Sequence, residues 1–296
     1  MTHQKPDPRL DDFDESWSVE RVRRRRGPVA RVMPMLAGFG AALLMGYAGL
    51  ATLGGVGRPV VAAEHSGATP AVIELFTSQG CYSCPPAEKL LGELVESGDP
   101  AQLIALEFHV DYWDSLVYGR HGSHKDPFSS PANTLRQRHY NQGALSGRSG
   151  VYTPQMVVNG RHGVIGSRRG DVLDGINRVE RPALELAVTA AGDGLLNVAL
   201  GGDLSALPSD AQVWLAVFDV EATTVVTTGE NHDKTLNSHH IVRTFEPVSP
   251  AGVAQFEVAL DLGQGQGCAL LVQSPDLGPI HGAAYCPESL WRLASS

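Results

Sequence analysis

The chain has 296 residues, of which 43% are hydrophobic and 19% are charged, values that are ordinary for a globular protein with a sizeable core. The net charge is −9, but residues 1–63 carry +3 and the remainder therefore carries −12. Such an acidic body argues against a nucleic-acid partner. Four cysteines are too few for a disulfide-dense scaffold, although an even number suits an oxidising compartment.

The first 63 residues predict a segment that directs export. Residues 1–31 are polar and end in an arginine-rich stretch, so we interpret them as a disordered cytoplasmic tail. Residues 32–57 contain no charged side chain and are long enough to cross a bilayer core of ~30 Å as one helix. Residues 32–63 are therefore either a signal peptide that is cleaved after small residues or a retained inner-membrane anchor. Both outcomes place the rest of the chain in the periplasm or outside the cell.

A short motif follows in which an apolar stretch leads to Cys81 and Cys84. We predict a buried strand over residues 70–78 and a helix that begins at Pro85 and ends near residue 97. A strand that delivers a Cys-x-x-Cys pair to a helix N-terminus is typical of a thioredoxin-like redox site. The helix N-terminus favours a thiolate, which is the species that attacks disulfides. An inert structural disulfide and a metal site are the alternatives.

The next elements extend this unit. In the predicted helix, Glu88 falls on the polar outer face, and residues 103–110 predict a second strand that lies parallel to the first. Residues 109–131 are aromatic, acidic and rich in turns, so they are either a wall of the redox cleft or a packed connecting loop. A helix is predicted over residues 131–143.

A Thr-Pro dipeptide, Thr153–Pro154, precedes an apolar strand at residues 155–158. We expect a cis proline here, beside the cysteine pair, where it would leave a strand backbone free to pair with a disulfide substrate. A hairpin turn at residues 159–160 and a closing helix over 171–179 complete a predicted thioredoxin-like domain, residues 64–181.

Short apolar alternations separated by Gly, Asp, Asn and Pro fill residues 182–296 and predict a β-rich, sandwich-like portion. Cys268 and Cys286 flank its last two strands, so they form either a structural disulfide or two buried thiols. Histidines 232, 239 and 240 match no ligand spacing, and we expect no metal and no cofactor.

Several motifs in one order resemble a family of bacterial secreted proteins known as the domain of unknown function 1223. They are Glu74–Ala87, His109–Asp114, Lys125–Phe128, Arg136–Arg138 and Tyr152–Val158. The resemblance covers about residues 70–290 and implies a thioredoxin-like fold with a C-terminal β portion. It implies fold more than function.

The fold class expected is thus an α/β thioredoxin-like domain followed by an all-β portion, and the function expected is an exported thiol–disulfide oxidoreductase. Cys81 would attack a disulfide or thiol substrate, either a protein or a small molecule, and Cys84 would resolve the mixed disulfide. Thr153 and Pro154 would position the substrate, and Glu74 would relay a proton if buried. The alternatives are a redox-inert thioredoxin-like binding module and a metal carrier. The redox hypothesis requires that Cys81 lie near Pro154 and be within reach of solvent.

Overall fold

The computed structural model describes residues 69–99, 101–142, 145, 150–192 and 194–291. All of them belong to one compact unit, Val60–Ser296. The predicted tail, residues 1–31, and the predicted signal or anchor, residues 32–63, lie outside the described residues. Within the described part of the chain, no helix combines the length and the apolar character needed to span a membrane.

The α-helices and the strands as far as β4 follow the order that the sequence predicts. The α-helices are α1 (Pro85–Ser97), α2 (Pro131–Gln142) and α3 (Arg169–Arg178), and the short 3-10 helices are η3 (Gly119–His121), η4 (Leu204–Ala206) and η5 (Glu288–Leu290). The strands are β1 (Ala71–Thr77), β2 (Leu103–His109), β3 (Gln155–Val158), β4 (His162–Ile165), β5 (Glu185–Gly192), β6 (Leu195–Gly201), β7 (Gln212–Val226), β8 (Lys234–Pro250), β9 (Gln255–Ala259), β10 (Gln266–Gln273) and β11 (Gly282–Tyr285).

Strands β1 and β2 form the parallel pair that the sequence predicts. They pair in register from Ala71 opposite Leu103 to Thr77 opposite His109, and α1 connects them. All seven residues of β1 are buried, because helices cover both faces of the sheet at this point. Helices α1 and α3 pack on the face that presents Ile73 and Leu75, whereas Tyr140 of α2 packs on the opposite face.

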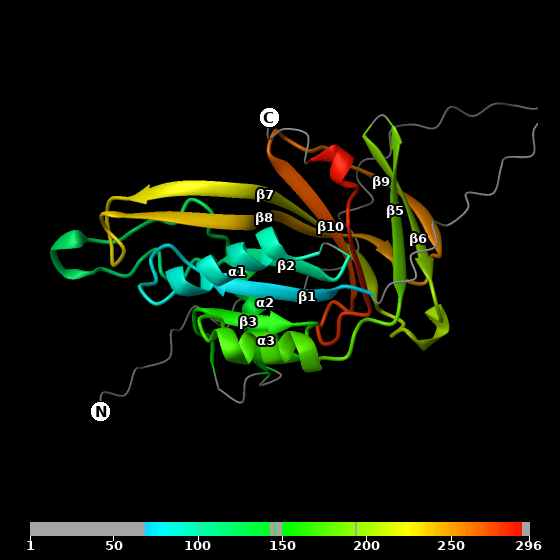
Figure 1. The fold of residues 1–296 in the computed structure, drawn as a ribbon, viewed down its shortest axis with the longest axis horizontal. Coiled ribbons are helices and arrows are strands. Elements are labelled where there is room, and N and C mark those ends of the chain that lie inside the picture. Colours follow the sequence, from blue (N-terminus) through cyan, green and yellow to red (C-terminus); the bar gives the residue numbers. More distant parts are fainter. Residues whose placement is uncertain (1–68, 100, 143–144, 146–149, 193, 292–296) are drawn as a thin grey trace, which may run out of the picture. The chain divides into compact units, whose positions relative to one another are not determined.

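The predicted fold class is wrong. The described residues are mostly β, with only three α-helices, and they show no clear thioredoxin-like α/β domain followed by a separate sandwich. Instead, strands from both parts of the chain form one eight-stranded mixed sheet in the order β11-β10-β7-β8-β2-β1-β3-β4 (Figure 1). Strands β5, β6 and β9 form a second, three-stranded sheet.

The physical reason lies in the second edge of β2. A buried strand has two edges that need hydrogen-bond partners, and β1 fills only one of them. Strand β8 takes the other edge through a parallel bridge between Glu107 and Ile241. Because β7 pairs with β8 along almost its whole length, and β10 and β11 follow β7, these four later strands continue the first sheet.

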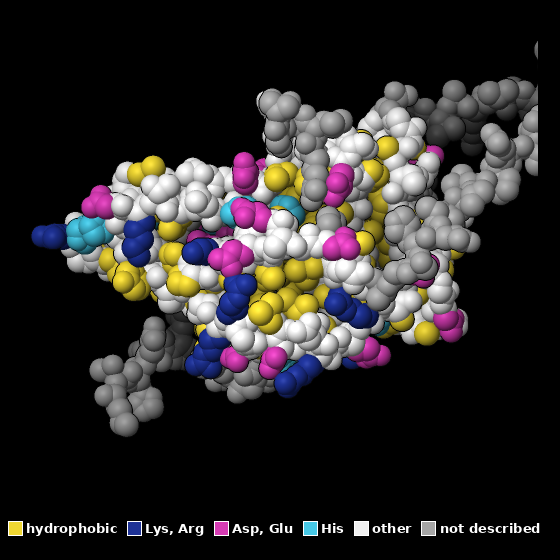
Figure 2. Space-filling view, viewed as in Figure 1, with side chains coloured by type: hydrophobic (Ala, Val, Ile, Leu, Met, Phe, Trp, Pro, Cys, Tyr) yellow, Lys and Arg dark blue, Asp and Glu magenta, His cyan; other side chains and the backbone are white. Residues whose placement is uncertain are grey.

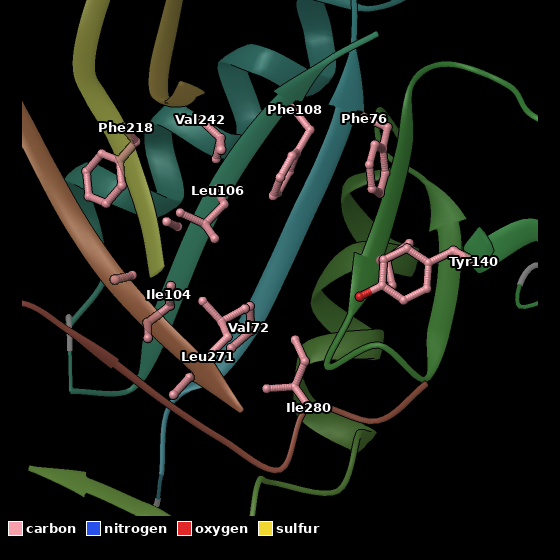
Figure 3. Close-up of a cluster of buried hydrophobic side chains, with 14 of the residues drawn as sticks. Val72, Phe76, Ile104, Leu106, Phe108, Tyr140, Phe218, Val242, Leu271 and Ile280 are labelled. Atoms are coloured by element: carbon pink, nitrogen blue, oxygen red, sulfur yellow. The ribbon is translucent and has the colours of Figure 1, made fainter. Parts of the chain in front are cut away.

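One hydrophobic cluster crosses this junction. Phe76 and Phe108 stack with ring centroids 5.4 Å apart, and they pack with Phe218, Val242 and other residues of β7, β8 and β10 (Figure 3). A second cluster lies between the three-stranded sheet and the part of the large sheet formed by β7 and β10. The two predicted halves therefore share their core.

Cys268 and Cys286 form a disulfide in this second cluster. Strands β10 and β11 pair antiparallel, and the Cys286 N–H donates to the Cys268 carbonyl at 2.8 Å. Of the two alternatives that the sequence leaves open, the structure has the disulfide.

Candidate functional site

Cys81 and Cys84 lie between the end of β1 and the start of α1. They form a disulfide with Cα atoms 5.4 Å apart. Cys84 is the N-cap of α1, and Pro85 and Pro86 occupy the first helical positions, where a missing N–H costs nothing. The sulfur pair therefore sits at the positive end of the helix dipole, as the sequence predicts.

Both cysteines are fully buried, with a relative exposure of 0% each, whereas Tyr82 between them is 62% exposed. This differs from the requirement that Cys81 be within reach of solvent. A segment that lies far from the cysteines in the sequence binds the backbone on both sides of Gly80. The side-chain amide of Asn231, in the connection between β7 and β8, donates to the carbonyls of Gln79 and Cys81 at 2.9 Å each.

Thr153 and Pro154 belong to the same region, as predicted. The indole N–H of Trp113 donates to the Thr153 hydroxyl at 2.8 Å, and the Trp113 side chain also packs closely against Gly80, next to Cys81. The Thr153–Pro154 peptide bond is cis. A Cβ placed on Gly166 would lie 3.2 Å from the Ala87 side chain and 3.4 Å from that of Pro154, so this proline lies close to the first turn of α1.

Glu74, the predicted proton relay, faces away from α1. It is fully buried on the α2 side of the sheet, where Arg136 donates to it at 2.7 Å and the Tyr140 hydroxyl donates to its other oxygen. Arg136 also donates to Gln273 of β10 at 2.8 Å. Burial alone would lower the pKa of Arg136, but the Glu74 carboxylate outweighs it and raises that pKa. This network joins β1, α2 and β10, and it does not join the cysteines.

The acid on the cysteine side is Glu88, which sequence reasoning placed wrongly on the outer face of α1. Glu88 is 1% exposed and follows Cys84 by one helical turn. The Thr77 hydroxyl donates to its carboxyl at 2.7 Å. Burial raises the pKa of Glu88 to about 8, and the nearby Glu107 adds to the rise. Glu88 therefore holds or releases a proton near neutral pH.

Three further buried titratable side chains interact with Glu88, and sequence reasoning gave none of them a role of its own. The two ring nitrogens of His109 contact Asp126 at 2.7 Å and Glu107 at 2.8 Å. Burial alone would lower the pKa of His109, but these carboxylates raise it well above its usual value. Burial would raise the pKa of Asp126, yet His109 and backbone N–H groups hold it below its usual range. His109 thus joins Asp126 to Glu107 through its two ring nitrogens.

Glu107, His109 and Asp126 connect to the loop between β1 and α1, residues 78–84, which carries both cysteines and which we name the cysteine loop. Asp126 also accepts the backbone N–H of Gln79 at 2.8 Å, and Glu107 accepts the backbone N–H of His239 at 3.0 Å. The acidic loop after β2 is therefore a wall of the cysteine site as well as a packed connection. No cluster of three or more His, Cys, Asp or Glu side chains in the described ranges is arranged to hold a metal ion.

The chain matches one protein-family model and is similar to solved structures. A family model described as "Protein of unknown function (DUF1223)" matches residues 72–273. A crystal structure of a protein from Agrobacterium tumefaciens is similar over 74% of this chain and 94% of its own, with 31% sequence identity and a TM-score of 0.59. HBP35 of Porphyromonas gingivalis covers 74% of this chain and 75% of its own, with 16% identity and a TM-score of 0.48. No curated protein matches the chain.

Proposed function

The chain belongs to the family described as protein of unknown function (DUF1223), and for this member we propose thiol–disulfide exchange at Cys81 and Cys84. One observation carries the proposal: the two cysteines form a disulfide at the N-terminal end of α1. Unpaired N–H groups and the helix dipole stabilise a thiolate at that place and so lower the pKa of a thiol there.

The proposed reaction runs through a mixed disulfide. In the reduced protein, the Cys81 thiolate attacks a substrate disulfide, forms a bond to one sulfur and releases the other as a thiolate that takes up a proton. Cys84 then loses its proton and attacks the Cys81 sulfur, which releases the second substrate thiol. Two electrons pass from the cysteine pair to the substrate, and the Cys81–Cys84 bond of the described structure is the product.

The surrounding residues have distinct parts in this proposal. Glu88 takes up the Cys84 proton, because it lies on the same helix face one turn later and its pKa of about 8 is close to that of a thiol. Thr153 and Pro154, held through Trp113, position the substrate chain beside Cys81. Glu74 has no part, since it binds Arg136 on the opposite face.

We also propose that the reaction takes place outside the cytoplasm. Two disulfides among the described residues suit an oxidising compartment, and residues 32–57 are the uncharged stretch from which we predict export. To test this, a reporter enzyme that folds only outside the cytoplasm is fused to the C-terminus of the chain. The reporter should be active, and removal of residues 1–63 should abolish the reporter activity.

The exchange reaction is tested with insulin as the disulfide substrate and dithiothreitol as the electron donor. We expect the full chain to accelerate insulin reduction, Cys81→Ser to abolish the acceleration and Cys84→Ser to trap a mixed disulfide on Cys81. The double variant Cys268→Ala/Cys286→Ala is the matched control and should stay active. Equal rates for the wild type and Cys81→Ser would rule the function out.

A second candidate, a redox-inert binding module, is favoured by the complete burial of both sulfurs. A buried disulfide reacts slowly and serves to hold the loop that carries Tyr82 in one conformation. Under this candidate, the wild type does not reduce insulin, and the Cys81–Cys84 disulfide persists in millimolar dithiothreitol.

A further inference from the structure

The buried disulfide has to become accessible before it can react. An incoming thiolate must reach a sulfur atom along the S–S axis. Cys81 and Cys84 are each 0% exposed, so the described arrangement offers no such approach. Some part of the surroundings must therefore move during exchange.

One of the segments that hold the cysteine loop is the connection between β7 and β8, residues 227–233, which we name the hairpin end. Its Asn231 is fully buried, and the side chain donates to the carbonyls of Gln79 and Cys81, on either side of Gly80. The Asn231 oxygen accepts from Lys234 at 2.9 Å. The amide thus uses both its donor and its acceptor atoms, and it fixes a backbone that is 150 residues away in the sequence.

Neighbouring residues add to this contact. The backbone N–H of Tyr82 donates to Glu230 at 2.8 Å, and the Lys234 ammonium lies 4.0 Å from the centroid of the Tyr82 ring. The hairpin end and the loop after β2 reach past the end of β1 together (Figure 1), and the Gly229 N–H donates to the His121 carbonyl at 2.9 Å. On the surface, histidine side chains gather beside charged ones at this end (Figure 2).

The hairpin end is held mainly by polar contacts, and in this it differs from the rest of β7 and β8. None of its residues belongs to the hydrophobic clusters of the described chain, whereas both strands contribute to them further along. A segment held by a few hydrogen bonds opens at a lower free energy than the packed core. The hairpin end can therefore lift from the cysteines while the sheet stays folded.

We propose that the hairpin end is a gate over the Cys81–Cys84 disulfide and that Asn231 is the positioning residue that keeps it closed. When the gate opens, Asn231 releases the Gln79 and Cys81 carbonyls, and a thiol gains access to Cys81. If the proposed exchange reaction takes place, the gate controls when a substrate can reach Cys81, and this role rests on the proposed function. The opening of the gate itself is measured without a substrate protein, as the rate at which a small thiol reduces the Cys81–Cys84 disulfide.

The test follows the reduction of each disulfide by dithiothreitol in the full chain, with alkylation and mass spectrometry to count the free thiols at each position. Asn231→Ala and Asn231→Asp both remove the donor, and we expect either one to accelerate reduction of Cys81–Cys84 about tenfold, since two hydrogen bonds that favour the closed gate are lost. The Cys268–Cys286 disulfide in the same molecule should keep its wild-type rate. Asn237→Ala, an exposed asparagine of the same hairpin, is the matched control and should change neither rate.

Two results would overturn the gate. In one, Cys81–Cys84 is reduced at the wild-type rate in both Asn231 variants. In the other, both disulfides accelerate by the same factor, because that pattern reports general destabilisation. A third result separates the two proposals: if Asn231→Ala accelerates only Cys81–Cys84, yet neither this variant nor the wild type reduces insulin, the gate stands and the catalytic function fails.

Discussion

The Thr77 hydroxyl, at the end of β1, donates a hydrogen bond to the carboxyl of Glu88 on α1 at 2.7 Å. This bond joins the strand before the cysteine loop to the helix after it. It holds an acid of raised pKa one helical turn from Cys84, inside a group that also contains Glu107, His109 and Asp126.

Glu88 should make stability fall as the pH rises. Its carboxyl loses its proton near pH 4.5 in the unfolded chain but near pH 8 in the folded protein, so the folded state binds more protons between these values. The free energy of unfolding should therefore decrease across this window. Glu88→Gln removes this contribution, and urea unfolding should find the variant more stable relative to the wild type at pH 8 than at pH 5. Glu96→Gln, an exposed change on the same helix, should show no such trend. An equal difference at both pH values would contradict a raised pKa.

Arg136→Met should destabilise the protein strongly. It leaves the Glu74 carboxylate buried without its partner, and the loss of one member of a buried ion pair costs about 3–5 kcal/mol. Arg138→Met, an exposed change on the same helix, should cost little. The double variant Glu74→Gln/Arg136→Met should recover part of the loss, because neither member of this pair is then left as an unpaired buried charge. Denaturant unfolding measures all three, and a loss below about 1 kcal/mol for Arg136→Met would show that the pair is not needed.

Trp113 and Thr153 should be energetically coupled. Their side-chain hydrogen bond joins the loop after β2 to the residue before Pro154. In a double-mutant cycle with Trp113→Phe and Thr153→Val, unfolding experiments should find a coupling free energy of about 1 kcal/mol. Strictly additive effects would mean that the bond contributes nothing. Under the proposed function, each single variant should also raise the KM for insulin.

The Cys268–Cys286 disulfide should be structural. Its cysteines are separated by 18 positions, and closing a loop of this size in the unfolded chain contributes about 3 kcal/mol. The double variant Cys268→Ala/Cys286→Ala should lose stability of that order in urea while it keeps the wild-type rate of insulin reduction. A loss of activity in a variant that is still folded would assign this disulfide a role in the reaction.

The sequence predicts the local parts of the site well. Apolar runs and turn residues locate β1, α1 and β2, and the Cys-x-x-Cys spacing together with Thr153–Pro154 identifies two segments that the structure brings close together. The prediction that Glu88 lies on the polar face of α1 is wrong, and the sequence itself indicates why. Glu88 precedes Leu91 by three residues and Val95 by seven, a spacing that places it on the apolar face of the helix. Strand alternation likewise separates Glu74 from Ile73 and Leu75, so the opposite direction of its side chain could have been foreseen.

The long-range parts could not be predicted in this way. The bridge between Glu107 and Ile241 joins β2 to a strand whose alternation shows only that it belongs to a sheet, not to which sheet. Asn231 lies in a polar turn that resembles any solvated hairpin, and nothing nearby in the sequence indicates that its amide is buried against the cysteine loop. Such pairings depend on the register of distant strands, which a local pattern does not specify.

The distance along the chain between Cys81 and Asn231 also has a consequence in time. A ribosome adds about 5–20 residues per second, so the 150 residues that separate the two take about 8–30 seconds to synthesise. Throughout that interval the nascent chain carries both thiols without the segment that later encloses them. An oxidant that forms the Cys81–Cys84 bond during this interval finds thiols that Asn231 does not yet cover, whereas one that arrives after folding finds both cysteines buried.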